Sequence, residues 1–376
     1  MSPLPAARAE IVVDLGAIRH NVRRLRELTG VAMMTVVKAD GYGHGMAETA
    51  RAAREAGANW IGVATIDEAL ALREGGDTGR VLCWLTVPGE DHALAIAADI
   101  DVTAYSVAEL YEIEAAVAVA GRPARVQLKV DTGLSRGGAP MDTWPDVVAA
   151  ALAGEQDGTW QVTGVWSHLA ASDEPDHPAN DAQEALFREA LAVAEDAGLR
   201  PEVRHLANSA GAILRPSARF DLVRVGLASY GLDPAPGHTP DLGLRPAMTV
   251  RATLAQTKPL AAGASVSYGH TWTAETDTTV GLVPVGYADG VPRHASNVAH
   301  VLVDGKQRAI RGRVCMDQFV VDLDGDLPGA GHDVVLFGDG SHGEPTAQDW
   351  AEASGTISYE IVTRVGGRMT RRYVDR

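Results

Sequence analysis

Cysteine, positive charge and long apolar runs are all scarce in this sequence. Only Cys83 and Cys315 occur among 376 residues, so no disulfide framework is implied and a reducing cytoplasm is the expected compartment. We interpret both cysteines as ordinary small apolar side chains, and we predict no metal site.

Lysine and arginine together number 33, against 49 aspartate and glutamate residues, which gives a net charge of −16. This balance opposes non-specific binding to nucleic acid and to anionic membrane surfaces, because like charges repel. No segment reaches about 18 apolar residues without a charge, and the N-terminus lacks the uninterrupted apolar stretch of a signal peptide. We therefore expect a cytoplasmic, globular protein that acts on small molecules and does not cross a membrane.

Up to about residue 240, the sequence alternates between β-type and helix-type hydrophobic patterns. In the first helical pattern Ile18, Val22 and Leu25 recur at helical intervals before Gly30 ends the run. The predicted strands are Val31–Val37, Trp60–Ala64, Val81–Val87, Val102–Tyr105, Ala124–Val130, Val162–Ser167, Glu202–Leu206 and Leu222–Val225. About eight β-then-α units predict an α/β fold with a (β/α)8 TIM-type barrel, and an open doubly wound sheet is the alternative.

From about residue 245 this alternation stops, and short β-branched runs separated by Gly, Asp and Pro turns follow. The runs are Met248–Ala255, Val280–Val285, Val298–Val303, Gln307–Arg313, Phe319–Leu323 and Asp333–Phe337. We therefore predict a barrel domain at residues 1–240 and a mostly β C-terminal domain at residues 241–376. Short helices are expected at Ala347–Gly355 and Ser358–Val365, and we interpret the basic segment Arg368–Arg376 as a solvated edge.

The most informative stretch is Thr35–Gly45, where a buried β-type run ends at Lys38 and breaks into a glycine-rich loop. A lysine that emerges from a buried strand is desolvated, which lowers its pKa and favours the free amine needed for Schiff-base chemistry. The glycines allow backbone amides to approach a phosphate closely, and Tyr42 adds a phenol. The pattern indicates a phosphorylated carbonyl cofactor, and a solvated lysine at a strand end is the alternative.

In a barrel of this kind the chemistry lies where strands end and loops begin. The candidate residues that follow predicted strands are Lys38, Tyr42, Arg136, His168, Asn208, Ser209, Arg224 and Gly226. We expect them to converge on one face of the barrel.

A series of motifs, in order along essentially the whole chain, resembles the alanine racemase family. The motifs are Val37–Gly45, Asp131–Arg136, His205–Ala210, Val223–Gly226, Val266–Gly269, Arg313–Gln318 and Ser358–Ile361. The resemblance implies a pyridoxal 5′-phosphate-dependent enzyme that interconverts L- and D-alanine and provides D-alanine for peptidoglycan. It also implies that the C-terminal domain contributes Tyr268 and Met316 to the active site.

Racemisation requires a proton to leave one face of the substrate α-carbon and another to return to the opposite face. The resemblance implies that Lys38 holds the cofactor covalently and serves as one base, with Tyr268 as the other. In the family this tyrosine reaches the active site of the neighbouring subunit, so a homodimer with shared active sites is implied. A phenol is a weak base at neutral pH, and the resemblance implies that His168, which lies beside both this tyrosine and the cofactor in the family, supports it and contacts the cofactor.

Arg224 lies at the position that, in the family, faces the pyridine nitrogen of the cofactor. Arginine does not give up a proton, so that nitrogen would stay unprotonated and the ring would be a poorer electron sink. This favours racemisation over transamination. His205 is expected to hydrogen-bond Arg224, and a structural, ion-paired arginine is the alternative reading.

The resemblance assigns the remaining residues to the phosphate and to the substrate carboxylate. The implied phosphate and cofactor set is Tyr42, Asn208, Ser209, Gly226, Leu227 and Tyr359. Arg136 and the backbone of Met316 are implied to bind the carboxylate, with Asp317 in a supporting place. Lys129 is carbamylated in many family members, and without that change two inward cations, Lys129 and Arg136, would repel each other.

Other functions remain open at this stage. A decarboxylase of the same barrel class would use a similar lysine, but its β domain normally carries a cysteine- and aspartate-bearing motif instead of Val-Ser-Tyr-Gly. A broad-specificity racemase usually carries an export signal, and a non-catalytic cofactor carrier normally lacks the β domain. A Schiff-base aldolase needs no phosphate set.

Overall fold

The structure, a computed structural model, describes residues 8–376, and the chain divides into two compact units. The barrel unit contains residues 18–41 and 45–244. The C-terminal unit contains the described residues up to 17, residues 42–44 and residues 245–376. From residue 245 onward the whole chain belongs to the C-terminal unit, and the predicted boundary was at residue 241.

The barrel unit is built on eight parallel strands in the order β8-β7-β6-β5-β4-β3-β2-β9. In chain order they are β2 (Ala32–Val36), β3 (Trp60–Val63), β4 (Arg80–Cys83), β5 (Asp101–Ala104), β6 (Ala124–Lys129), β7 (Trp160–Trp166), β8 (Val203–His205) and β9 (Leu222–Val225). Backbone hydrogen bonds join the two ends of this order, from Asp221 N to Arg204 O and from Arg224 N to Ala207 O. This nearly closed arrangement confirms the predicted TIM-type barrel.

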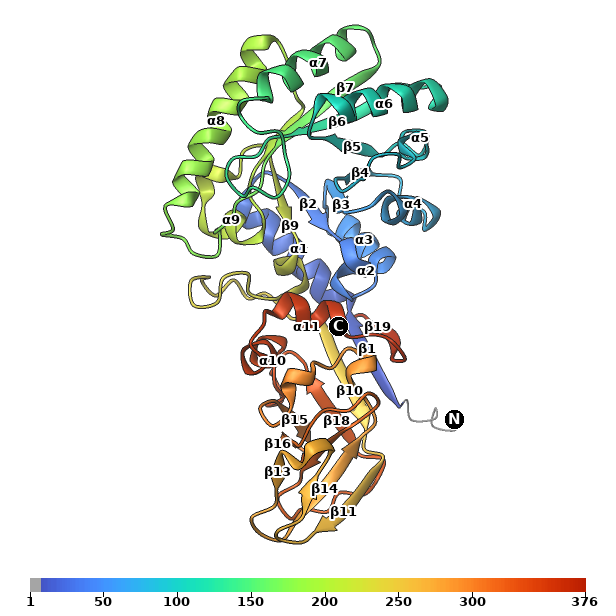
Figure 1. The fold of residues 1–376 in the computed structure, drawn as a ribbon, viewed down its shortest axis with the longest axis vertical. Helices are drawn as coiled ribbons and strands as arrows, with labels where there is room; N and C mark the ends of the chain where they lie inside the picture. Colours follow the sequence, from blue (N-terminus) through green and yellow to red (C-terminus); the bar gives the residue numbers. More distant parts are fainter. Residues whose placement is uncertain (1–7) are drawn as a thin grey trace. The chain divides into compact units, whose positions relative to one another are not determined.

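Helices alternate with the barrel strands (Figure 1). They are α1 (Leu15–Thr29), α3 (Met46–Glu55), α4 (Ile66–Glu74), α5 (His92–Ala97), α6 (Val107–Ala120), α7 (Trp144–Gln156), α8 (Ala179–Ala197) and α9 (Ser209–Leu214). Their starts follow from the sequence, since Thr65 and Glu68 form a capping box on α4 and Ser106 caps α6. In residues 8–376 no helix is long and apolar enough to span a membrane.

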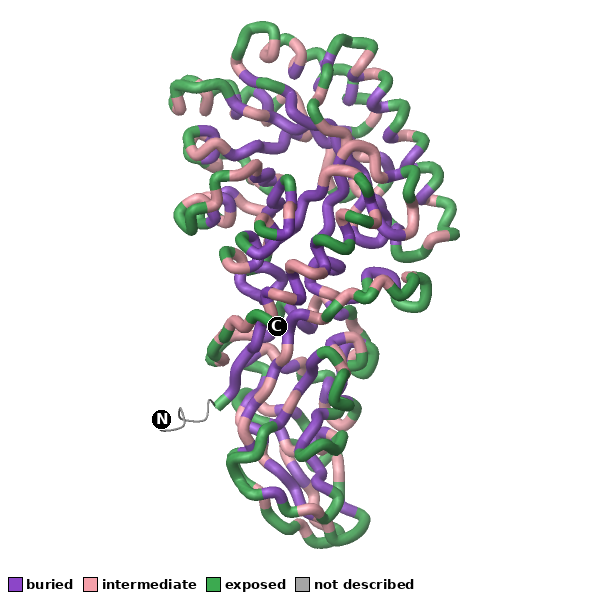
Figure 2. The backbone as a smooth tube through the Cα atoms, turned by 180° about the vertical axis from the view of Figure 1, so that it is seen from behind, coloured by how far each residue is buried: buried purple, intermediate pink, exposed green. Residues whose placement is uncertain are grey.

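Burial explains why the barrel strands have almost continuous apolar sequences. All four residues of β3, β5 and β9 are buried, because helices cover one face and the barrel interior the other. Figure 2 shows buried backbone along the strands and exposed backbone mainly on helices and turns. Polar residues at the strand ends are therefore exceptions that require partners.

The C-terminal unit contains a nine-stranded sheet in the order β11-β14-β17-β16-β15-β18-β10-β1-β19. Its strands are β1 (Ala9–Asp14), β10 (Met248–Thr253), β11 (Gln256–Leu260), β14 (Thr278–Val283), β15 (His300–Val303), β16 (Lys306–Arg311), β17 (Phe319–Asp322), β18 (Asp333–Phe337) and β19 (Thr370–Val374). A separate hairpin pairs β12 (Ser265–Val266) with β13 (Trp272–Thr273), and the helices are α10 (Ala347–Ser354) and α11 (Ser358–Arg364).

One prediction about this unit requires correction. Strand β1, which we counted with the barrel at residues 1–240, pairs antiparallel with β10 and parallel with β19. Its apolar residues Ile11 and Val13 are buried in that sheet, although its sequence neighbours form a barrel helix. The basic segment interpreted as a solvated edge contains β19, which is the edge strand of the sheet, and exposed Arg372 forms an ion pair with Glu10 on β1. Residues 1–7 of the predicted barrel lie outside the described residues.

Candidate active site

Lys38 stands at the head of an unusual turn that directly follows β2. The next three residues, Ala39, Asp40 and Gly41, have φ angles of 52°, 53° and 64°. A left-handed conformation costs roughly 1–2 kcal/mol for each residue other than glycine. Hydrogen bonds offset this cost, since Ala39 N donates to Glu68 Oε1 at 2.7 Å and Met46 N donates to Asp40 Oδ1 at 3.0 Å. The predicted loop is therefore an ordered turn that gives Lys38 a defined direction.

The surroundings of Lys38 favour its neutral amine. Burial is the largest influence that lowers the pKa of Lys38, and the positive charges of Arg136 and Arg224 lower it further. Glu68 acts in the opposite direction. The Lys38 Nζ atom lies 5.9 Å from the ring centroid of Trp84. The depressed pKa that the strand-end position predicted is thus present, with two arginines as additional causes.

Arg224 lies on β9 and is only 5% exposed. Its guanidinium donates to the carbonyls of Ser167, His205 and Leu206 at distances of 2.8–3.2 Å. It also donates to Nδ1 of His205 and to Nδ1 of His168, both at 3.0 Å. Burial lowers the pKa of Arg224 to about 9, which leaves it charged at neutral pH. The hydrogen bond to His205 was predicted, whereas the bond to His168 was not.

Both histidines beside Arg224 are held neutral. Burial, followed by the charge of Arg224, holds the pKa of His168 and of His205 well below its usual range. Because Arg224 donates to each Nδ1, each neutral ring carries its proton on Nε2. The Nε2 of His205 pairs with Gln127 Oε1 at 2.8 Å. His168 therefore offers its Nε2–H as a hydrogen-bond donor, and its Nε2 cannot accept a proton.

Lys129 ends β6 and is 7% exposed, so it points inward as its place in the strand predicts. Its Nζ atom lies 4.7 Å from the ring centroid of Trp166 and 5.2 Å from that of Tyr105. Burial, followed by the charges of Arg224 and Arg136, lowers the pKa of Lys129 to about 8. Arg136 itself is exposed. Of the two cations expected to face inward, Lys129 does so and Arg136 does not, although the charge of Arg136 still acts on Lys129.

Ser209 organises a group of backbone amides at the start of α9. Its Oγ accepts from the amide N–H of Gly226 at 3.0 Å and from that of Ala228 at 3.4 Å. Asn208 caps the helix by accepting from the amide N–H of Gly211, and it receives a bond from the Ser172 hydroxyl. Leu227 is buried between the two donors, at the start of a short 3-10 helix, η2 (Leu227–Tyr230). The barrel residues of the predicted phosphate set therefore adjoin one another.

Two further members of that set lie in the C-terminal unit. The rings of Tyr42 and Tyr359 are 6.1 Å apart between centroids, and Tyr359 lies on α11. The backbone of Gly43 packs directly on this helix, because a Cβ atom there would lie 2.1 Å from the carbonyl oxygen of Val362. Burial, followed by Tyr359, raises the pKa of the Tyr42 phenol. Tyr42 is therefore a neutral hydrogen-bond donor at neutral pH.

Tyr268 and Met316 are exposed residues of the C-terminal unit. Tyr268 begins a 3-10 turn, η3 (Tyr268–His270), and is 72% exposed, while Met316 is 53% exposed. Asp317 forms an ion pair with Arg368 at 2.7 Å, and Arg368 also pairs with the buried carboxylate of Asp289. The structure thus groups Lys38, Lys129, His168, His205 and Arg224 in the barrel unit, and places Tyr268, Met316 and Asp317 in the other.

Aromatic residues complete the barrel site, and sequence reasoning missed them. The rings of Trp166 and His205 are stacked, with centroids 5.7 Å apart and an interplanar angle of 4°. The Arg224 Cζ atom lies 4.8 Å from the Trp166 ring centroid, and Trp84 meets Trp166 edge to face at 6.2 Å. Trp166 ends β7 and Trp84 follows β4. Both would have been predicted if the search for candidate residues at strand ends had included aromatic as well as polar side chains.

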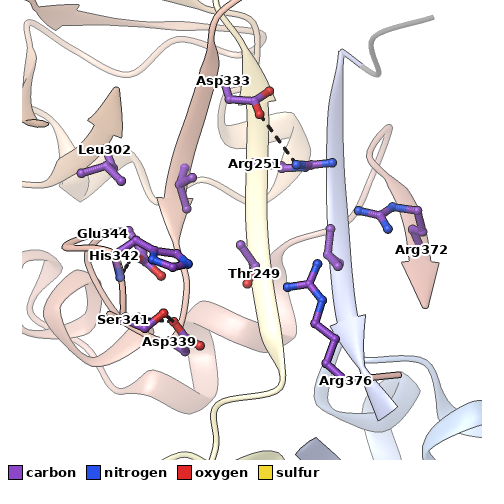
Figure 3. Close-up of a pocket in the computed structure, with 12 residues that line it drawn as sticks. Thr249, Arg251, Leu302, Asp333, Asp339, Ser341, His342, Glu344, Arg372 and Arg376 are labelled. Atoms are coloured by element: carbon purple, nitrogen blue, oxygen red, sulfur yellow. Dashed lines mark hydrogen bonds and ion pairs between the residues drawn. The ribbon is translucent and has the colours of Figure 1, made fainter. Parts of the chain in front are cut away.

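A cavity of about 200 Å³ in the C-terminal unit contains none of the predicted site residues (Figure 3). Arg251 in its lining pairs with Asp333, and also with Glu10, which lies outside the lining. The Asp339 carboxylate accepts from the Ser341 hydroxyl at 2.6 Å. Within residues 8–376 no group of three or more His, Cys, Asp or Glu side chains could hold a metal ion. The barrel site remains the candidate for chemistry.

Comparisons with known proteins cover both units. The N-terminal domain model of alanine racemase matches residues 13–234, and the C-terminal domain model matches residues 247–373. The alanine racemase of Salinispora arenicola is 56% identical over 368 residues, which cover 98% of each chain.

Solved structures agree with these matches. Alanine racemase from D-cycloserine-producing Streptomyces lavendulae has a TM-score of 0.97 at 53% identity, covering 99% of this chain and 98% of that one. Alanine racemase from Bartonella henselae, solved with covalently bound pyridoxal phosphate, has a TM-score of 0.88 at 29% identity, covering 98% of this chain and 100% of that one.

Proposed function

The chain belongs to the alanine racemase family, and we propose that it interconverts L- and D-alanine with pyridoxal 5′-phosphate as cofactor. The observation that carries this proposal is the desolvated Lys38, whose pKa is lowered by burial and by the charges of Arg136 and of the buried Arg224. By family implication the D-alanine serves peptidoglycan synthesis, in the cytoplasm.

The residues present fit this cofactor. Lys38 would hold it covalently, because burial and two arginines favour the nucleophilic neutral amine. Arg224 would face the ring nitrogen, and a charged guanidinium cannot protonate it. The phosphate would be held by Tyr42, Ser209, Tyr359 and the amides of Gly226 and Leu227, with Asn208 capping the adjoining helix. When bound, pyridoxal phosphate supplies an electron sink that makes the α-proton of alanine acidic.

The protein would supply two opposed bases. Lys38 would remove or return the α-proton on one face of alanine, and Tyr268 would do so on the other. Since Tyr268 is largely exposed in the single chain, we propose that it serves the active site of a partner subunit in a homodimer. His168, neutral with its proton on Nε2, would support this tyrosine as a hydrogen-bond donor.

The substrate carboxylate would be bound by Arg136 and the backbone of Met316, with Asp317 held in place by Arg368. We propose that Lys129 is carbamylated. At a pKa of about 8 a useful fraction of its amine is neutral, and that amine can add to carbon dioxide and release a proton. The resulting anion would replace repulsion between Lys129 and Arg136 with attraction.

The cofactor assignment is tested with the purified protein and its visible absorption. The protein loaded with pyridoxal phosphate should show a band that sodium borohydride removes and that Lys38→Ala lacks. Lys258→Ala, which alters an exposed lysine of β11, is the control and should keep the band. A band of equal strength in Lys38→Ala would overturn the assignment.

The reaction is tested with L-alanine in deuterated water. Deuterium should enter the α-position and D-alanine should form; exchange without D-alanine would refute the racemase assignment. Tyr268→Phe should keep the absorption band and lose most turnover. Tyr111→Phe, at an exposed tyrosine of α6, is the control and should leave turnover unchanged. If Tyr268→Phe turns over normally, Tyr268 is not a base. Release of carbon dioxide would instead support a decarboxylase, and turnover of bulkier amino acids a broad-specificity racemase.

A further inference from the structure

The residue before Tyr268 has a backbone conformation that side chains rarely adopt. Ser267 has φ 62° and ψ −178°, in a region that is essentially restricted to glycine. Conformations of this kind persist only when the surroundings enforce them. Because Ser267 directly precedes the proposed base, the contacts that enforce its strained conformation matter for the direction of Tyr268.

The Ser267 side chain is anchored to the neighbouring segment 312–315. Its hydroxyl donates to the carbonyl oxygen of Arg313 at 2.6 Å and lies 3.4 Å from the Cys315 sulfur. The backbones are in close contact as well. A Cβ atom on Gly312 would lie 2.7 Å from Val266 O and 2.8 Å from the Ser267 Cβ. Only glycine at position 312 allows this approach.

The segment that anchors Ser267 also carries Met316. The carbonyl of Cys315 accepts from Tyr287 N at 3.1 Å, and the carbonyl of Met316 accepts from Ala288 N at 3.0 Å. Gly286 fits only without a side chain, because its Cβ would lie 2.2 Å from the Cys315 carbonyl oxygen. Segment 312–316 is therefore held on two sides. Ser267 contacts one side, and the turn at residues 286–288 contacts the other.

We propose that Ser267 is a positioning residue for Tyr268. Its hydroxyl bond to the Arg313 carbonyl holds the strained backbone in place, and that backbone sets the direction in which the Tyr268 phenol leaves the turn. Because Arg313 and Cys315 lead directly into Met316, the same bond keeps the base and the substrate-binding backbone in register. This inference rests on the proposed role of Tyr268.

Ser267→Ala and Ser267→Gly test the proposal. Alanine removes the hydroxyl, and glycine removes both the hydroxyl and the steric strain, so that folding is not threatened. Each should lower kcat by about tenfold, the effect of misplacing a proton-transfer group by one hydrogen bond, with KM for alanine within about twofold of the parent. Ser265→Ala is the matched control. It removes a 2.8 Å hydroxyl contact with Thr273 in the same hairpin and should change neither constant.

A purely structural role is distinguished by isotope effects. With α-deuterated L- and D-alanine, the kinetic isotope effect should rise for the enantiomer deprotonated by Tyr268 and not for the one deprotonated by Lys38. Equal changes for both enantiomers, or unchanged kcat in both Ser267 variants, would overturn the proposal. Suppose that the Ser267 variants overturn the proposal. If Tyr268→Phe then turns over normally, the proposed role of Tyr268 as a base is wrong as well. If Tyr268→Phe is inactive, only the proposed role of Ser267 is wrong.

Discussion

Arg224→Lys retains a positive charge at the centre of the barrel site but removes the planar group that organises it. Arg224 is buried and donates to five acceptors, three of them carbonyls and two of them histidine nitrogens. A lysine ammonium has only three N–H bonds, so at least two buried acceptors must lose their donor. At roughly 1–3 kcal/mol for each buried group left unsatisfied, the free energy of unfolding should fall by about 2–6 kcal/mol.

Urea unfolding of the apoprotein, followed by far-UV circular dichroism, measures this change. Arg219→Lys is the matched control, because Arg219 is only partly buried and donates to the carbonyls of Ala212 and Leu28. We expect the control to cost about 1 kcal/mol or less.

Equal losses of stability in the two variants would refute the reasoning. That result would mean that the carbonyls and imidazoles around Arg224 find other partners at no cost, and that the guanidinium does not organise His168 and His205. A loss confined to Arg224→Lys, with broadened resonances of both imidazoles in NMR spectra, is the expected outcome.

Three further predictions concern pH, carbon dioxide and helix capping. Below about pH 6.5 His205 takes up a proton in the unfolded chain but stays neutral in the buried folded state. The free energy of unfolding should therefore fall by up to about 1.4 kcal/mol for each unit by which the pH is lowered. His168 contributes in the same way, so His205→Gln should reduce the slope of urea unfolding between about pH 5 and 7 by this amount and leave the share of His168; an unchanged slope would assign it elsewhere. Removal of dissolved carbon dioxide should lower the turnover number, bicarbonate should restore it, and Lys129→Met should abolish the dependence. Asn208→Ala should cost about 1 kcal/mol of stability through loss of its cap on α9; Thr143→Ala, at a helix start without such a bond, should cost less.

Much of the fold was predictable because its signals are local. Each barrel strand is a short apolar run followed by a helical pattern, and all eight predicted strands are present, with ends that differ by a few residues. β1 was assigned to the wrong unit, and the pairing of β19 was not predicted, because both depend on residues more than 200 positions away. No local pattern distinguishes a strand that enters one sheet from a strand that enters another.

The candidate site divides in the same way. The position of Lys38 at a strand end predicted a desolvated amine. The resemblance of the motifs around His205 and Arg224 led us to expect the bond between these two residues. The contribution of Glu68 to the Lys38 turn and the stacking of Trp166 on His205 were not predicted. Each joins residues from different strands or helices, so it follows from the strand order of the barrel and not from sequence spacing.

Sequence pattern was therefore sufficient for the kind of each element and for the residues at its end, since hydrophobic period and turn chemistry act over a few residues. The charge state of those end residues required the folded chain. Lys38, Lys129, His168 and His205 have lowered pKa values because the barrel removes them from water beside Arg224. The strained backbone of Ser267 likewise depends on a hydrogen bond to Arg313, 46 residues further along the chain.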